Sequence, residues 1–462
     1  MSTSLFTVQE HVLPCQHIRG YPRSTARSQE EVLHIAIKQY TPLDNRQPKP
    51  GDVTIIGAHA NGFPKELYEP LWDELLHRAK QSGISVRGIW IADVAFQGAS
   101  GVLNEGKLGN DPSWFDHPRD LLHMINHFRD QMPRPLIGIA HSMGGNNLVN
   151  LSLHHPRLLE TLILIDPVVQ HFSSAQGNYA PAQASTFRRD RWPSRQAAAV
   201  AFKRSKFYQT WDPRVLDLWI KHGLRDLPTP LYPTATPASS TPPPLSADPS
   251  SATVSPASDT ENEVTLTTTK HQEVFTFLRP NFPTPSHPNP GTQPNRRTHP
   301  DVDLTAHPTA PFYRPEPIIT FANLPHLRPS VLYLFGSKSP LSGPAFRKDK
   351  MATTGVGVGG SGGAPEGRVK EVLFDGVGHL IPMEIVGRTA DECLAWLGPE
   401  MARWREGEEA ERREWAAVPE GERVVLGKDW NSAMPTQYHS VLRRARVFLP
   451  PSQEDLAKHF PA

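Results

Sequence analysis

The sequence has few cysteines, no long apolar run and no excess of charge of either sign, and each shortage excludes a class of protein. Cys15 and Cys393 are the two cysteines among 462 residues, which excludes a disulfide scaffold and favours a reducing compartment such as the cytoplasm. No apolar run reaches the roughly 20 residues of a membrane span, so we expect no transmembrane segment. Lys and Arg number 48 against 47 Asp and Glu, and this balance argues against a nucleic-acid-binding surface.

Proline, by contrast, is abundant, and its placement divides the chain. There are 48 prolines, roughly twice ordinary usage, and much of the excess lies between Pro228 and Pro315. Residues 229–263 are dominated by Pro, Ser, Thr and Ala, a composition that cannot bury enough apolar surface to order itself. We therefore expect a disordered insert over 229–263 and a Pro-rich loop over 283–315.

Outside these stretches, short apolar runs alternate with helical segments. Runs such as Val53–Gly57, Leu136–Ala140 and Val331–Phe335 have the length of buried strands. Strands that alternate with helices predict an α/β fold with a mostly parallel, doubly wound sheet. The pattern breaks after Val169, where an aromatic-rich helical stretch predicts a cap over the sheet edge, with most of its aromatic rings packed in the cap's own core. Pro317–Phe321 is predicted to begin the return to the sheet.

The predicted organisation is a sheet core that is interrupted by the cap and its inserts. The seven segments are the first part of the core (1–168), the helical cap (169–228), the disordered insert (229–263), the second part of the cap (264–282), the Pro-rich loop (283–315), the second part of the core (316–398) and a C-terminal helical extension (399–462). Within the extension, Tyr438–Phe448 is predicted to form a basic amphipathic helix. In such a fold the loops after the parallel strands open on one edge of the sheet, where sites form.

The stretch Pro135–Leu153 carries the strongest chemical signal. An apolar run, a turn of small residues around Ser142 and a helical segment follow one another. This order is that of the nucleophile elbow of α/β-hydrolases, whose usual G-x-S-x-G pattern is here A-H-S-M-G. The backbone crowds the serine from both sides, and Ala140 is the smallest substitute for the first glycine. The alternative is a glycine-rich turn with an incidental serine.

A nucleophilic serine needs a general base and an acid that orients it. His379 follows the last predicted strand at the same sheet edge, in the chain order serine, acid, histidine, and we predict it as the base. His59 and His141 also lie on loops at this edge. We expect His59 to shape the oxyanion loop and the side chain of His141 to point away from the serine.

The position of the acid departs from the usual pattern. In most α/β-hydrolases it follows the first strand after the cap, where this chain has Ser339. Asp166 ends the strand after the elbow helix, and neighbouring strands lie about 4.8 Å apart, so Asp166 shares the sheet edge with the serine. We predict Asp166 as the acid. The alternatives are Asp349, farther along the chain, as the acid, and a turn-capping role for Asp166 before Pro167.

Acyl transfer also needs hydrogen-bond donors for an oxyanion. The backbone N–H of Met143 follows the nucleophile at a helix N-terminus, which carries a positive partial charge. The second predicted donor is the N–H of Asn61, in the loop after an early strand, with Gly62 as the second choice. Glu384 is expected to cap the closing helix.

Five segments together form a recognisable signature: HANGFPKELYEPLWDEL, AHSMGG, LIDPV, FGSKSPLS and GVGHLIPME. They resemble a fungal group of α/β-hydrolases that includes hydrolases of toxin and polyketide biosynthesis, the acyl-CoA hydrolase of the mycophenolic acid pathway and peroxisomal lipase-like relatives. The match runs from about Phe6 to Trp396, apart from the Pro-rich inserts. AHSMGG alone indicates an α/β-hydrolase, whereas HANGFPKELYEP with an acid after the elbow helix is more specific. The resemblance implies Ser142, Asp166 and His379 as a catalytic triad.

The resemblance also implies hydrolysis of esters or thioesters of lipid-like acyl groups. Several relatives carry a C-terminal peroxisomal signal, but LAKHFPA is not of the S-K-L type, so we expect a cytoplasmic protein. The glycine-rich residues 354–363 lack the Lys-Ser/Thr ending of a phosphate-binding loop and are predicted to be a flexible connector. We therefore predict a serine hydrolase that acts without cofactor or metal on an acyl ester or acyl-CoA thioester. The alternative is a non-catalytic relative that binds an apolar ligand or a protein partner.

Overall fold

The computed structural model describes residues 4–172, 178–233, 262–293, 295–303 and 311–434. The chain divides into two units, Met1–Met401 and Ala402–Ala462. Most of the insert predicted over 229–263 and the helix predicted over Tyr438–Phe448 lie outside the described residues. Among the helices that are described, none combines the length and apolar character that crossing a membrane requires.

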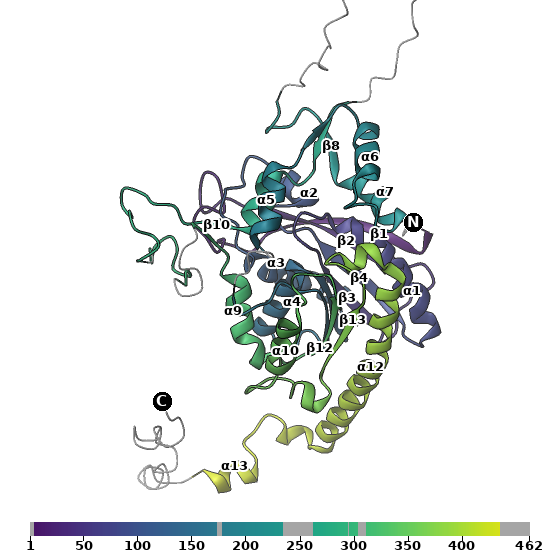
Figure 1. Ribbon diagram of the computed structural model, residues 1–462. Helices are drawn as coiled ribbons and strands as arrows, with labels where there is room; N and C mark the ends of the chain where they lie inside the picture. The colour runs from purple at the N-terminus through teal and green to yellow at the C-terminus, as the bar shows by residue number, and fades with distance from the viewer. Residues whose placement is uncertain (1–3, 173–177, 234–261, 294, 304–310, 435–462) are drawn as a thin grey trace, which may run out of the picture. The chain divides into compact units, whose positions relative to one another are not determined.

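An eight-stranded sheet organises the first unit (Figure 1), in the order β1-β2-β4-β3-β5-β6-β12-β13. The strands are β1 Phe6–Pro14, β2 His34–Pro42, β3 Val53–Ala58, β4 Val86–Ala92, β5 Leu136–His141, β6 Thr161–Ile165, β12 Ser330–Gly336 and β13 Val369–Phe374. The pairs β1–β2 and β2–β4 are antiparallel, and all later neighbours are parallel. The predicted mostly parallel sheet is therefore confirmed.

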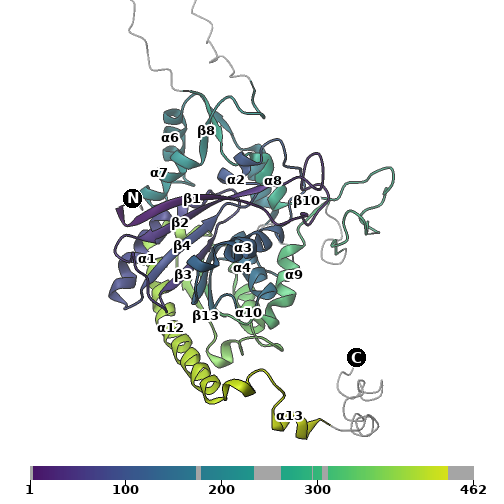
Figure 2. The same cartoon turned by 180° about the vertical axis from the view of Figure 1, so that it is seen from behind.

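Helices cover both faces of the sheet, as the two opposite views show (Figures 1 and 2). One face packs against α1 (Glu69–Gln81) and residues 386–401 of α12 (Val386–Ala417). The other packs against α3 (Asp116–His127), α4 (Met143–His154) and the segments around α9 (Glu316–Asn323) and α10 (Pro344–Thr353). Because successive strand residues point to opposite faces, Ile137 belongs to the first core and Leu136 to the second. The central strands are apolar throughout because both of their faces are buried.

The chain between β6 and α9 forms a cap beside the carboxyl ends of the parallel strands. Its helices are α5 (Ala180–Phe187), α6 (Arg195–Arg204), α7 (Pro213–His222) and α8 (Lys270–Phe277), with small strands β7 (Arg191–Trp192), β8 (Leu224–Asp226) and β9 (Val264–Leu266). The rings of Phe202 and Tyr208 lie 4.9 Å apart and those of Tyr208 and Trp211 lie 5.0 Å apart. The cap aromatics thus pack largely against one another, as predicted.

The prediction that Pro317–Phe321 begins the return to the sheet is wrong. These residues belong to the helix α9, and the sheet resumes at β12. Pro317 lies in the first turn, where its missing N–H costs nothing, and the Thr320 hydroxyl accepts a hydrogen bond from Asn150 of α4 at 2.7 Å. Five apolar-rich residues are too few to distinguish a helix from a strand by periodicity, and packing against α4 decides the outcome.

The glycine-rich residues 354–363 connect α10 to β13. The N–H of Gly355 donates to the carbonyl oxygen of Leu324 at 2.8 Å, and that of Gly357 donates to the carbonyl oxygen of Pro325 at 2.7 Å. Gly355 has a φ of 75°, a left-handed conformation that favours glycine. The segment is a connector, as predicted. Its flexibility stays a prediction, and these hydrogen bonds join it to the end of α9.

Candidate active site

Ser142 lies on the sharp turn between β5 and α4, with φ 57° and ψ −117°. A non-glycine residue adopts this conformation at a cost in energy, which the surrounding structure must offset. The Ser142 N–H donates to the carbonyl oxygen of Ile165 at 2.9 Å. A Cβ on Gly144 would collide with the carbonyl oxygen of Ala58. Glycine at position 144, two residues after the serine, is therefore required by the close approach of α4 to β3.

His379 lies between the serine and the predicted acid. Its Nε2 is 2.9 Å from Ser142 Oγ, and its Nδ1 is 2.6 Å from Asp166 Oδ2. The register of β5 and β6 pairs His141 with Ile165, so Ser142 and Asp166 occupy matching positions just beyond the two strands. The structure thus brings the three predicted residues into one hydrogen-bonded chain, in which the imidazole can take the serine proton.

Asp166 is completely buried and has further hydrogen-bond donors. The hydroxyls of Ser339 and Ser342 donate to its two carboxylate oxygens, which holds the carboxylate in line with the imidazole. Ser339 stands where most α/β-hydrolases have the acid, and Ser342 was missed because a lone serine carries no signal. Asp349, the alternative acid, lies partly exposed, with its Oδ2 3.3 Å from His171 Nδ1.

The loop after β3 presents three successive backbone N–H groups. Ala60 donates its N–H to the hydroxyl of Tyr68 at 2.8 Å, and Gly62 donates to Gln97 Oε1 at 2.7 Å. Within the described residues, the N–H groups of Asn61 and Met143 have no hydrogen-bond acceptor, and both residues line the same cavity as Ser142. Of the two alternatives, Asn61 therefore has the available donor, since that of Gly62 is occupied.

The two other histidines at this edge are held away from the serine. Val94 donates its N–H to His59 Nε2 at 2.9 Å, so the Nδ1 of His59 carries the proton that the Ala60 carbonyl oxygen accepts. His141 lies between the Tyr68 hydroxyl, 3.0 Å from Nδ1, and the carbonyl oxygen of His379, 2.9 Å from Nε2. Burial lowers the pKa of His141 well below its ordinary value, so the ring is neutral. Tyr68, which no sequence motif marked, links the oxyanion loop to His141, and His141 in turn contacts the backbone of the base.

A cavity of about 640 Å³ opens above Ser142. The cap supplies most of its apolar wall, through Trp192, Phe202, Phe207 and Tyr208. Two charged residues of the wall form an ion pair, with Arg188 Nη1 2.9 Å from Glu273 Oε2. Among the described residues, no three His, Cys, Asp or Glu side chains are grouped so as to hold a metal ion. Because aromatic side chains form most of its wall, the cavity has the apolar lining that an acyl chain requires.

Comparison with known proteins identifies relatives over almost the whole chain. Residues 71–222 match the family model "Serine aminopeptidase, S33". Type I acyl-CoA thioesterase mpaH of Penicillium roqueforti is 45% identical over 437 residues, which cover 93% of this chain and 95% of that protein. The chain therefore belongs to the α/β-hydrolase family that includes this Penicillium protein. The similarity that the sequence motifs indicated is therefore confirmed, as is the prediction of a hydrolase.

More distant proteins share the family's fold. Abhydrolase domain-containing protein AFT2-1 of Alternaria alternata is 28% identical over 60% of this chain and 92% of its own length. The solved structure of the peroxisomal alpha-beta-hydrolase Lpx1 of Saccharomyces cerevisiae superimposes with a TM-score of 0.62 at 15% sequence identity, and covers 96% of this chain and 97% of that one. At this identity the likeness to Lpx1 shows the common fold. As a family member, the protein is an enzyme of ester or thioester hydrolysis.

Proposed function

We propose that the protein is an acyl-CoA thioesterase that acts through an acyl-enzyme on Ser142. The observation that carries this proposal is the hydrogen-bonded chain from Ser142 Oγ through His379 to Asp166, at 2.9 and 2.6 Å, at the base of a large apolar cavity. The substrate class is supported by the name of the Penicillium relatives, type I acyl-CoA thioesterase, which match over more than nine-tenths of this chain.

In the acylation step, His379 Nε2 takes the proton of Ser142 while Oγ attacks the thioester carbonyl carbon. The carbonyl oxygen gains negative charge, and the N–H groups of Asn61 and Met143 donate to it. When this tetrahedral intermediate collapses, the C–S bond breaks and His379 gives its proton to the leaving thiolate. The products of this step are free thiol and an acyl group that is esterified to Ser142.

In the deacylation step, a water molecule takes the place of the thiol. His379 accepts one proton of the water while its oxygen attacks the acyl carbon, and the proton then returns to Ser142 Oγ as the carboxylic acid leaves. Asp166 accepts the Nδ1–H throughout, which fixes the tautomer of the imidazole and stabilises the imidazolium. The apolar cavity holds the acyl chain in place during both steps.

Labelling by a fluorophosphonate, together with release of free thiol from acyl-CoA thioesters of varied chain length, tests this proposal. The wild type is expected to be labelled and to release thiol, and Ser142→Ala is expected to do neither. Ser337→Ala is the matched control, since its exposed hydroxyl lies beyond β12 and bonds to Asp375. A folded wild type that neither reacts nor releases thiol would support the alternative, a non-catalytic binding protein.

We also propose that the protein resides in the cytoplasm. It is supported by Cys15 and Cys393, both of which are free, buried thiols and belong in a reducing compartment. Microscopy of a fluorescent fusion beside organelle markers checks this, and co-localisation with a peroxisomal marker would contradict it.

A further inference from the structure

The side chain of Asn61 is held from both sides. Its Oδ1 accepts a hydrogen bond from Gln97 Nε2 at 2.5 Å, and its Nδ2 donates to the carbonyl oxygen of Glu273 at 3.1 Å. The next N–H of the chain, that of Gly62, donates to Gln97 Oε1 at 2.7 Å. Gln97 thus forms hydrogen bonds with two successive residues of the oxyanion loop.

Gln97 also reaches the cap. It follows β4 and is completely buried, and its Nε2 donates a second hydrogen bond to Thr276 Oγ1 on α8 at 3.1 Å. The Gln97 amide has two N–H donors, and Asn61 and Thr276 use both of them. Loss of this side chain would therefore leave Asn61 Oδ1 and the Gly62 N–H, both buried, without a partner. The Thr276 hydroxyl would keep only its hydrogen bond to the carbonyl oxygen of Gln272.

The helix α8 is also a wall of the cavity. Glu273 and Phe277 line the space above Ser142. Trp114, which lines it too, donates its indole N–H to the carbonyl oxygen of Thr276 at 2.8 Å. The wall that contacts the acyl chain and the loop that carries the Asn61 N–H are therefore joined through Gln97.

We propose that Gln97 is a positioning residue, which keeps the Asn61 N–H aimed at the developing oxyanion and fixes the oxyanion loop to the cap helix α8. This inference rests on the proposed function. An oxyanion donor stabilises the transition state when its position is set before the reaction, and loss of one such donor costs about 10² to 10³ in kcat. A displaced donor costs less than a missing one, yet a misplacement of about 1 Å can lower the rate 10²-fold.

Two substitutions at this position separate the effects. Gln97→Glu keeps the shape and the acceptor for Gly62, but it loses both N–H donors and places a carboxylate against Asn61 Oδ1. Gln97→Met loses all the bonds. Both are expected to lower kcat on an acyl-CoA by about 10- to 100-fold and to leave KM within about threefold, because the acyl wall stays in place.

Inhibitor binding distinguishes positioning from a general structural role. A trifluoromethyl ketone of the same chain length, which forms a tetrahedral adduct with Ser142, is expected to lose affinity by the same factor as kcat. The free fatty acid, which places no oxyanion against Asn61, is expected to keep its affinity. A purely structural effect would weaken both ligands alike.

The contact with the cap is tested by a matched pair of variants. Thr276→Val removes the acceptor of Gln97 Nε2 and is expected to lower kcat about 3- to 10-fold. Thr268→Val removes the hydrogen bond from the Gly98 N–H to Thr268 Oγ1, 2.9 Å long, which joins the same two parts of the chain without touching the oxyanion loop. It is expected to leave kcat unchanged.

The inference is overturned if Gln97→Met, shown to be folded by circular dichroism, keeps the kcat of the wild type. Equal losses of affinity for the ketone and the fatty acid would overturn it as well. If the Gln97 variants do not fold, the pair at Thr276 and Thr268 decides, and equal activities of the two would count against the proposal. Failure of the proposed function itself is distinguishable, because the wild type would then release no thiol from any acyl-CoA.

Discussion

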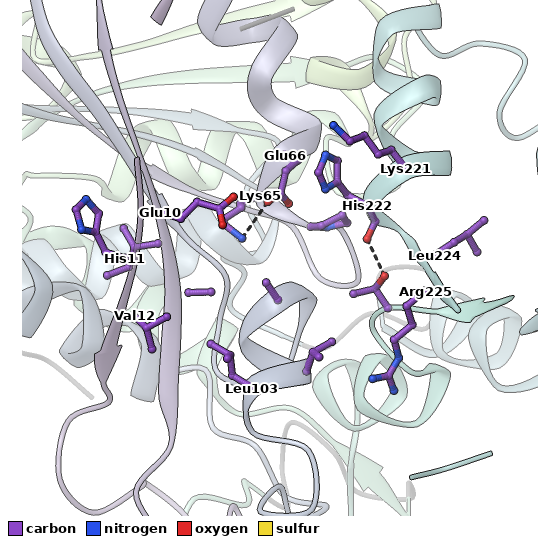
Figure 3. A pocket seen from close by; sticks show the side chains of 16 residues that line it. Glu10, His11, Val12, Lys65, Glu66, Leu103, Lys221, His222, Leu224 and Arg225 are labelled. Carbon is purple, nitrogen blue, oxygen red and sulfur yellow. Dashed lines mark hydrogen bonds and ion pairs between the residues drawn. The ribbon is translucent and has the colours of Figure 1, made fainter. Parts of the chain in front are cut away.

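Two cavities adjoin the cap, and they differ in whether hydrogen-bond donors are left free in their walls. The one above Ser142 has a volume of about 640 Å³. The other, about 460 Å³, lies between β1, α2 (Gly98–Leu103) and α7 (Figure 3). In this second cavity Lys65 Nζ lies 3.0 Å from Glu66 Oε1 and 2.7 Å from Asp93 Oδ2. Arg225, on its far wall, is paired with Glu105 at 2.6 Å.

The comparison shows that a polar lining does not by itself make a site. In the second cavity the buried charges of Lys65 and Glu66 neutralise one another, so both side chains already have partners within the protein. In the first, the N–H groups of Asn61 and Met143 have no acceptor among the described residues, and the Ser142 hydroxyl faces the same space. A carbonyl that reacts with the serine needs free hydrogen-bond donors beside the nucleophile, because they stabilise the negative charge that develops on its oxygen.

Two buried lysines differ in the same way, since one has partners within the protein and the other has no hydrogen-bond partner among the described residues. Lys65 is paired, and Asp93 and Glu66 raise its pKa in spite of burial. Lys350, on α10, has no hydrogen-bond partner for its Nζ among the described residues. Burial lowers the pKa of Lys350 to about 8, although the charges of Asp166 and Asp349 act in the opposite direction. The paired ammonium of Lys65 therefore stabilises the folded protein, whereas the unpaired ammonium of Lys350 destabilises it.

The largest expected effect is at the acid. Asp166→Asn is expected to lower kcat by about 10⁴, because an amide in this position no longer stabilises the imidazolium or holds its tautomer. The measurement is kcat on any acyl thioester that is turned over, with circular dichroism to show that the fold is kept. Asp349→Asn, at the partly exposed pair with His171, serves as the control and is expected to be nearly silent. The opposite result would assign the acid to α10.

The next effect is on stability in the second cavity. Lys65→Met leaves the carboxylates of Glu66 and Asp93 without their shared cation, and removal of one partner of a buried ion pair costs about 3 to 5 kcal/mol. The free energy of unfolding, from urea titration at pH 7, is the measurement. A loss of less than about 1 kcal/mol would show that these charges are not coupled as their distances indicate.

The unpaired lysine is expected to act in the opposite direction. Lys350→Met should raise the free energy of unfolding at pH 7 by about 3 kcal/mol, because it removes an ammonium whose pKa falls from 10.5 to about 8 on folding. Between pH 8 and 10.5 the unfolded wild type binds more protons than the folded form, so its stability rises with pH over this window. The variant lacks that rise. Urea unfolding at pH 7 and pH 10 measures both, and a less stable variant at pH 7 would contradict the interpretation.

The smallest effect is expected at the rim of the second cavity. Lys221 is exposed there, and Lys221→Gln should change kcat/KM for an acyl-CoA by less than about twofold, since exposed substitutions rarely alter energies by more than 0.5 kcal/mol. Steady-state kinetics with a CoA thioester and with the same acyl group on a short uncharged thiol are the measurement. A tenfold loss confined to the CoA substrate would show that this cavity binds part of the substrate.

The sequence by itself determined the fold class and the nucleophile's setting. An apolar strand, small residues around Ser142 and a helix are local features, and only a tight turn accommodates them in that order. The alternation of strands and helices predicted the parallel sheet for the same reason, since each element expresses its own periodicity. The chain order of Ser142, Asp166 and His379 placed them at one edge, because parallel strands end together.

Tertiary structure alone decided what depends on contacts between distant segments. Pro317–Phe321 became helical because its neighbour is α4, which no local pattern reveals. Gly62 rather than Asn61 lost its free N–H because Gln97, 35 residues away, accepts it. Asp349, on α10, pairs with His171, whereas His379 pairs with Asp166. In each case the deciding group is remote in the chain. For Asn150 and Gln97 burial also makes the hydrogen bond obligatory, so the outcome exists only once the fold has formed.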